Sequence, residues 1–146
     1  LGYRNGVVSY PFGSWSIPAH GCSEKSFDET TQTMHIMAPY KDAQEPWKWM
    51  IKANAYTFEK EIPTFLKKLE KPVDVMDAFS FEKEAVICKG IVENLDEYYT
   101  VVVQANCEKD TLFLECIVRD EQDIAMLKEW CQGIKHRVTI SDELHS

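Results

Sequence analysis

Apolar and polar residues alternate in two stretches of the first third of the chain, which predicts half-buried β-strands. In residues 31–38 every second position from Met34 onward is apolar. In residues 47–53, Trp47 and Trp49 share one face of a strand, whereas a helix would spread them around its surface. Both stretches are therefore expected in a sheet with one buried face.

Further strands are predicted where turn residues interrupt apolar runs. Two short strands are expected at residues 7–10 and 14–17, separated by Pro11 and Gly13, and the polar segment 22–30 is expected to be a loop. The later connections are short, which predicts antiparallel hairpins. The longer strands are expected at residues 73–81, 85–92, 98–107 and 111–118.

Apolar residues spaced three and four apart predict two amphipathic helices. The first is expected between Thr57, a candidate N-cap, and Pro72, and the second spans residues 120–135. We therefore expect an α+β fold, an antiparallel sheet flanked by two main helices, in a single domain over residues 1–146 with a loose tail from about residue 138. The two apolar stripes are Ile62, Phe65, Leu66 and Leu69, and Ile124, Leu127, Cys131 and Ile134.

The composition excludes several classes of function. A formal net charge of −8 repels phosphate backbones and anionic lipid, so we expect no nucleic-acid partner, and this charge suits a basic protein partner. No run approaches the ~20 apolar residues of a transmembrane segment. The chain begins at Leu1 rather than Met, so we expect that a signal peptide or lipoprotein leader was removed or that upstream residues were left out, and this missing start favours export. Unpaired thiols favour the cytoplasm, so a periplasmic and a cytoplasmic location both stay open.

Five cysteines are present, so at least one is unpaired. Two-residue turns at 95–96 and 109–110 would pair residue 88 with 103 and residue 103 with 116. Cys88 and Cys116 would then lie two strands apart, ~9.5 Å, which is beyond the reach of a disulfide. We expect four thiols in the core, and the alternative is a disulfide between Cys131 and a strand cysteine. The core thiols would be Cys88, Cys107, Cys116 and Cys131.

The stretch "SIPAHGCSE" contains the fifth cysteine, Cys22, two residues after His20. A solvated loop is the preferred interpretation, because catalytic Cys and His residues are usually far apart in sequence and two ligands are too few for a metal site. Neither CxxC, GxGxxG, a P-loop, GxSxG, HExxH nor an EF-hand loop occurs in the sequence. We therefore expect no catalytic residues, no metal and no cofactor.

Aromatic residues are the candidates for partner binding. Trp47 and Trp49 would stand side by side on one strand face, and Trp15 and Tyr40 are further candidates. Tryptophan often anchors protein interfaces, and this interpretation expects the indoles to be partly exposed. The alternative is that they pack beneath the first helix as core residues.

The order of the expected elements resembles a known family. The strand "SWSIP" is followed by a polar stretch, an alternating strand, a helix, a run of antiparallel strands and a terminal helix. This order is similar to the PsbP-like α/β/α sandwich, which includes small bacterial envelope lipoproteins and Eag-type secretion chaperones. Members that open with "LPxGW" carry a Trp soon after the Pro, whereas Ala19 follows Pro18 here. The resemblance implies a fold that is mainly non-enzymatic.

Two hypotheses of function follow. The first is a non-enzymatic protein-binding module, such as a chaperone, immunity protein or envelope accessory protein, that uses a sheet face or edge with aromatic anchors; a homodimer also remains open. The second is a small thiol-dependent hydrolase that uses Cys22 with a His base. The second hypothesis predicts a pocket at Cys22 and a thiol pKa below the usual value.

Overall fold

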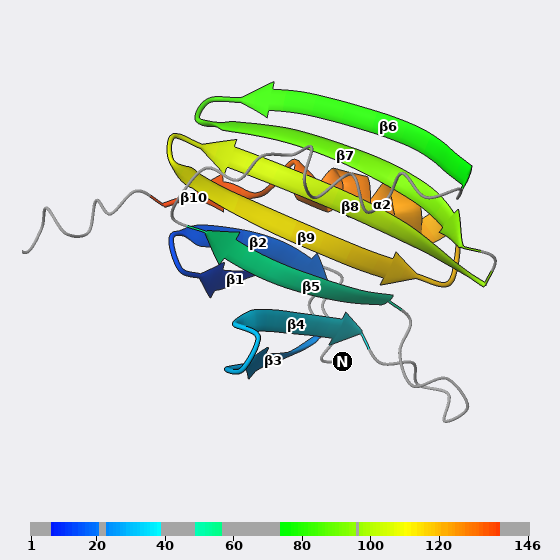
Figure 1. Cartoon of the computed structure of the whole chain (residues 1–146), viewed down its shortest axis with the longest axis horizontal. Coiled ribbons are helices and arrows are strands. Elements are labelled where there is room, and N and C mark those ends of the chain that lie inside the picture. Colours follow the sequence, from blue (N-terminus) through cyan, green and yellow to red (C-terminus); the bar gives the residue numbers. More distant parts are fainter. Residues whose placement is uncertain (1–6, 21–22, 39–48, 57–73, 96, 138–146) are drawn as a thin grey trace, which may run out of the picture.

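The computed structural model describes residues 7–20, 23–38, 49–56, 74–95 and 97–137. These residues form two antiparallel sheets and one short helix, shown in Figure 1. The two sheets pack around a shared apolar core, and the helix covers part of the same core. Within this part of the chain, no helix is long and apolar enough to cross a membrane.

The elements divide into a three-stranded small sheet, a seven-stranded large sheet and the helix α2. The small sheet has the order β1-β2-β10, and the large sheet has the order β3-β4-β5-β9-β8-β7-β6. In chain order the elements are β1 (Val7–Phe12), β2 (Trp15–His20), β3 (Glu24–Asp28), β4 (Thr33–Ala38), β5 (Trp49–Tyr56), β6 (Asp74–Lys83), β7 (Val86–Leu95), β8 (Tyr98–Cys107), β9 (Asp110–Val118), α2 (Gln122–Cys131) and β10 (Lys135–His136).

The expected α+β arrangement with two main helices, the PsbP-like α/β/α sandwich, is wrong. The described residues are mostly strand, in two sheets, with α2 as their single short helix. Alternation predicted the strands and the antiparallel pairing correctly, but it does not say which sheet a strand joins. The first expected helix, within residues 57–73, lies outside the described residues, whereas the second is confirmed as α2.

Residues 24–28 form β3, so the predicted loop over residues 22–30 is also wrong. This strand lies at an edge of the large sheet and most of its side chains are exposed, which explains its polar composition. Its hairpin with β4 is supported by Asp28, whose carboxylate accepts a backbone hydrogen bond from Thr30 at 2.9 Å. An edge strand of this kind does not show the apolar alternation that marks a half-buried strand.

One face of the large sheet is apolar and is covered by two different elements. The strand β2 of the small sheet and the helix α2 both contact this face, and Ile17, Ile51 and Leu127 meet between them. Figure 1 shows α2 behind β7 and β8, while β1 and β2 lie nearer to β5. We call this face of the large sheet, and the face of the small sheet that meets it, the inner faces.

The hairpin registers differ by two residues from those predicted. Residue 103 pairs with 114 rather than 116, and residue 88 pairs with 105 rather than 103. Side chains alternate with a period of two, so a shift of two residues leaves each on the same face. The predicted burial of Cys88 and Cys116 is therefore confirmed, although the predicted pairing partners of these residues are wrong.

The edge strand β6 is fixed to the rest of the fold by side chains on its inner face. Lys128 of α2 forms an ion pair with Asp77 and lies 5.3 Å from the ring centre of Phe79. The ring of Phe79 fills the space above Gly90, where a β-carbon would lie 2.1 Å from its Cζ. The glycine therefore provides the space in which the aromatic ring of the edge strand packs.

Substitution of this glycine should displace the ring of Phe79. We expect Gly90→Ala to lower the free energy of unfolding by about 1 to 3 kcal/mol, because an added methyl group overpacks the site. Urea denaturation of Gly90→Ala, Phe79→Ala and the double variant measures this. The double variant should lose less stability than the sum of the single losses, and simple additivity would contradict the close packing.

Candidate functional site

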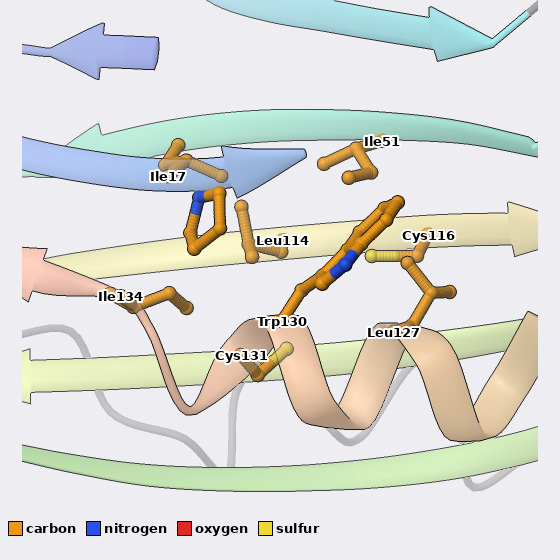
Figure 2. Close-up of a pocket in the computed structure, with 9 residues that line it drawn as sticks. Ile17, Ile51, Leu114, Cys116, Leu127, Trp130, Cys131 and Ile134 are labelled. Carbon is orange, nitrogen blue, oxygen red and sulfur yellow. The ribbon is translucent and has the colours of Figure 1, made fainter. Parts of the chain in front are cut away.

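A small apolar cavity lies where α2, β2, β5 and β9 meet. Its volume is about 10 Å³, and Figure 2 shows Trp130 and Leu127 pointing into it from α2. The lining is almost entirely apolar, with the thiols of Cys116 and Cys131 among the lining groups. Such a cavity holds at most one water molecule and offers that water too few polar partners. The cavity is a packing defect of the core rather than a substrate pocket.

Four cysteines surround the core as free thiols, which confirms the predicted burial of Cys88, Cys107, Cys116 and Cys131. Burial raises the pKa of the Cys88 thiol to about 12 and raises the pKa of Cys131 well above its usual value. A nucleophilic cysteine requires the opposite shift, because the thiolate is the reactive form. These four thiols are therefore structural. Cys22 and the side chain of His20 lie outside the described residues.

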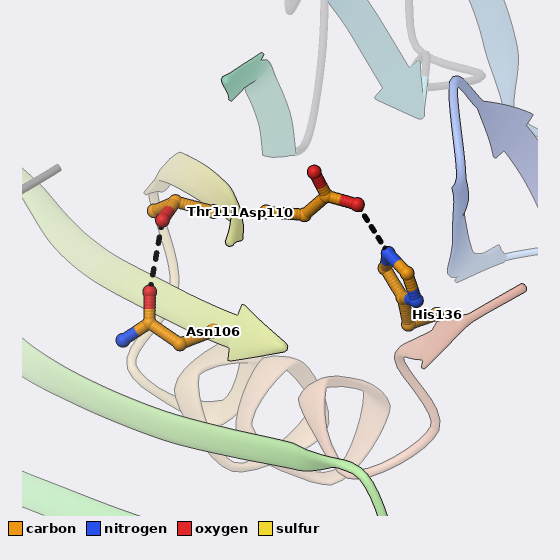
Figure 3. Close-up of polar contacts among 4 residues, drawn as sticks. All are labelled: Asn106, Asp110, Thr111 and His136. Atoms are coloured by element: carbon orange, nitrogen blue, oxygen red, sulfur yellow. Dashed lines mark hydrogen bonds and ion pairs between the residues drawn. The ribbon is translucent and has the colours of Figure 1, made fainter. Parts of the chain in front are cut away.

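The imidazole of His136 joins the two sheets. Its Nε2 lies 2.6 Å from Oδ2 of Asp110 on β9, as Figure 3 shows, while β10 itself pairs with β2. The ring also packs edge-on against the indole of Trp15 at 4.9 Å. Nearby, Thr111 donates a hydrogen bond of 3.0 Å to the side-chain oxygen of Asn106. The contact between His136 and Asp110 links the end of the small sheet to the large sheet, whereas the bond between Thr111 and Asn106 lies within the large sheet.

A buried carboxylate lies on the outer face of the large sheet. Glu93 is 2% exposed, and its Oε1 has no hydrogen-bond partner in the structure as described. Burial, and secondarily the charge of Glu115, raises the pKa of Glu93. Over residues 7–137, wherever the structure describes them, no group of three or more His, Cys, Asp or Glu residues could hold a metal ion. The buried carboxylate is thus not part of a metal site there.

The most distinctive surface lies where the edge strands β1 and β3 come together, and we call it the open side. It consists of Val8, Tyr10 and Phe12 of β1 and of Lys25 and Phe27 of β3. All five are on inner faces, because each pairs directly with a residue that is buried in the core. Yet Phe27 is 48% exposed and Val8 is 36% exposed. The two sheets are therefore not closed against each other here.

Contacts between side chains give the open side a defined geometry. The rings of Phe12 and Phe27 lie 6.4 Å apart, and the hydroxyl of Tyr10 lies 2.8 Å from the hydroxyl of Ser23. The ammonium group of Lys25 lies 5.7 Å from the ring centre of Tyr10. The open side therefore combines aromatic rings and one positive charge on β1 and β3, each of which is an edge strand of its sheet.

The aromatic residues proposed from the sequence as anchors lie elsewhere. Trp15 and Trp49 are 1% and 2% exposed, so the partly exposed Trp49 of the partner-binding interpretation is instead a core residue. Its indole packs edge-on against that of Trp130 at 5.0 Å, which buries it beneath α2. Trp47 and Tyr40 lie outside the described residues. Neither of the two described anchors, Trp15 and Trp49, therefore lies on the open side.

Phe27 is not among the candidates from the sequence because it lies in the polar segment 22–30, for which a loop is predicted. In the sequence Phe27 is a single aromatic residue with the charged residues Lys25 and Asp28 nearby. This pattern is typical of an exposed edge strand. No protein-family model and no curated protein sequence matches the chain. The functional argument therefore depends on the geometry of the open side itself.

The buried thiols should be unreactive in the folded protein. In a Cys22→Ser background, we expect none of the four core thiols to react with a chromogenic disulfide at pH 8, because their pKa values are raised by burial. All four should react in urea. A thiol that reacts rapidly without denaturant would show that the core at that position is open to solvent.

The contact between His136 and Asp110 should stabilise the fold. We expect a coupling energy of about 1 kcal/mol in a double-mutant cycle of His136→Ala and Asp110→Ala, as for other partly buried hydrogen bonds. Lys135→Ala, an exposed neighbour on the same strand, is the control and should have little effect. A coupling energy near zero would mean that the pair does not hold the two sheets together.

Proposed function

We propose that the protein is a non-enzymatic binding module that holds a protein partner at its open side. The observation that carries this proposal is Phe27, an aromatic residue on an inner face that is nonetheless 48% exposed. Buried aromatic residues at interface centres often carry much of the binding energy, and a half-exposed ring with apolar neighbours is suited to that role. The proposal places the protein with chaperones, immunity proteins or envelope accessory proteins.

The distribution of exposed apolar side chains supports the same surface. Among described residues, the large apolar side chains that are exposed are Val7, Val8, Phe27, Met76 and Ile87. Val8 and Phe27 belong to the open side and Val7 lies on the opposite face of β1, whereas Met76 and Ile87 lie singly on β6 and β7. Scattered exposed residues are ordinary on protein surfaces, but a group beside two sheet edges favours partner binding.

The charge of the chain indicates which partners would associate fastest. A net charge of −8 attracts a basic protein over a distance of about a Debye length and so raises its rate of association. The same charge disfavours nucleic acids and anionic surfaces. We therefore propose a protein partner with a net positive charge.

The core of the protein offers little to support an enzyme. The cavity is small and apolar, and burial raises the pKa of the thiols around it. The alternative hypothesis of a thiol-dependent hydrolase depends on Cys22, and no described side chain favours it. The binding module is the function that the described geometry supports best.

A photo-reactive amino acid at position 27 tests the proposal. In extract of the source cells, we expect it to crosslink one defined protein, which is then purified and titrated against the unmodified chain. Phe27→Asp should weaken this binding at least tenfold, because it replaces a buried apolar contact by a charge.

The matched control uses Ile87, which is 45% exposed but lies on β7, away from β1 and β3. A photo-reactive residue at position 87 should not crosslink the same protein, and Ile87→Asp should leave its affinity unchanged. Equal crosslinking from both positions, or equal loss of affinity in both variants, would contradict binding at the open side.

A further inference from the structure

We propose that the open side receives one extended segment of the partner, which pairs with β1 as a fourth strand of the small sheet. This inference rests on the binding function proposed above and specifies how the partner is recognised. It is carried by two features of the described residues: the unprotected edge of β1 and the half-exposed inner face of β3. Each feature restricts the occupant further.

The edge of β1 lacks the protection that edge strands usually have. Among the described strands β1 pairs only with β2, so no described strand occupies its second edge, and its sequence "VVSYPF" contains no charge. By contrast, the edge strand β6 carries a bulge between Val75 and Asp77 together with several charged residues. Charges, bulges and prolines are the common means by which edges avoid pairing, and β1 has only Pro11 among them.

The large sheet extends beyond the small sheet at this edge. In Figure 1, β3 lies outside the outline of β1 and β2. Phe27 is on the inner face of β3, opposite Met34 in the register, but Met34 is 3% exposed while Phe27 is 48% exposed. The two residues differ because Met34 lies on β4, inside the sheet, whereas Phe27 lies on the edge strand β3, where its contact with Phe12 of β1 leaves it 48% exposed. The inner face of β3 therefore lies beneath the free edge of β1.

A strand added to β1 fits this arrangement. Paired strands lie ~4.8 Å apart and stacked sheets ~10 Å apart, so a strand next to β1 would lie above β3 and cover Phe27. Every second side chain of that strand would point towards Phe27 and Phe12, whose rings lie 6.4 Å apart. The added strand would gain backbone hydrogen bonds from β1 and bury apolar surface on β3, which is the usual combination in recognition by strand addition.

The same geometry argues against a second copy of the chain as the occupant. Antiparallel pairing of two β1 edges about a two-fold axis would place both large sheets on the same side of the joined small sheets. Each copy carries a projecting β3, and the two projections would then occupy the same space. A single extended segment has no second layer and meets no such obstacle, so the structure favours a partner strand.

The expected ligand is an extended peptide with apolar residues at alternate positions and basic residues at its ends. The apolar positions match Phe12 and Phe27, and the basic ends match the net charge of −8. Lys25, on the same inner face, disfavours a further positive charge at the centre of the segment. Such a segment is chemically distinct from a helix or a folded surface.

The test uses a synthetic peptide, acetyl-KVTVTVK-amide, and the full chain. Binding is measured by calorimetry, and amide hydrogen exchange is measured with and without the peptide. We expect saturable binding, with at least tenfold slower exchange at amides of β1 and unchanged exchange at β6, the other long edge. A peptide with N-methyl groups on alternate residues keeps the side chains but cannot pair, and it should bind at least tenfold more weakly.

Two variants separate the side-chain contribution from general effects. Phe27→Ala should weaken binding of the peptide about tenfold, whereas Ile87→Ala, a substitution of similar exposure elsewhere, should not change it. Both variants are checked for an unchanged denaturation midpoint. Slowed exchange at β6 instead of β1, or equal affinities of the two variants, would overturn the proposed strand addition.

Other occupants give different results. Concentration-dependent dimerisation that is abolished by Val8→Lys would identify a second copy and overturn the inference. Faster exchange of β1 in a chain lacking residues 1–6 would identify those residues as the occupant and also overturn it. Peptide binding that requires Phe27 but leaves exchange of β1 unchanged would overturn strand addition alone. The proposed function fails if position 27 crosslinks no defined protein, or if position 87 gives the same crosslinking or the same loss of affinity.

Discussion

The fold depends on covering one face of a seven-stranded sheet. The inner face of the large sheet is apolar, and its burial is the main source of the free energy that stabilises the fold. Neither α2 nor the small sheet is wide enough to cover this face alone, so the two elements share it. Trp130 of α2 packs against Trp49 of the large sheet, and Trp15 and His136 pack against each other on the small sheet. The positions of the tryptophans are a consequence of this division.

The open side arises from the same constraint. The small sheet ends at β1, whose side chains only partly cover β3, the edge strand of the large sheet. Most uncovered sheet edges in proteins are made polar, and β3 is indeed rich in charge, but Phe27 on its inner face is not. The proposed protein partner would explain why an apolar residue on an inner face is exposed, because the partner would cover it. The functional proposal follows from this mismatch between side chain and environment.

Sequence periodicity and turn residues predicted the strands of the large sheet other than β3, their antiparallel pairing and the faces of the thiols, because alternation depends on local burial. It could not assign β1 and β2 to a second sheet, since a half-buried strand has the same pattern in either one. The edge position of β3 also removed the alternation that would have revealed it. The sequence alone leaves Trp15 and Trp49 as candidate anchors, because a large apolar residue shows the same pattern in a core and at an interface. Phe27 is recognised only when its neighbours in space are known.

The buried thiols also bear on how the chain is made. Cys88, Cys107 and Cys116 lie on successive strands joined by tight hairpins, which form in ~1 to 10 μs, whereas disulfides form over seconds or longer. The hairpins can therefore form before oxidation, and closure of the sheet then shields the thiols from oxidants. A chain of this design would reach its folded state with reduced cysteines even in an oxidising compartment, so its thiol content does not reveal where it works.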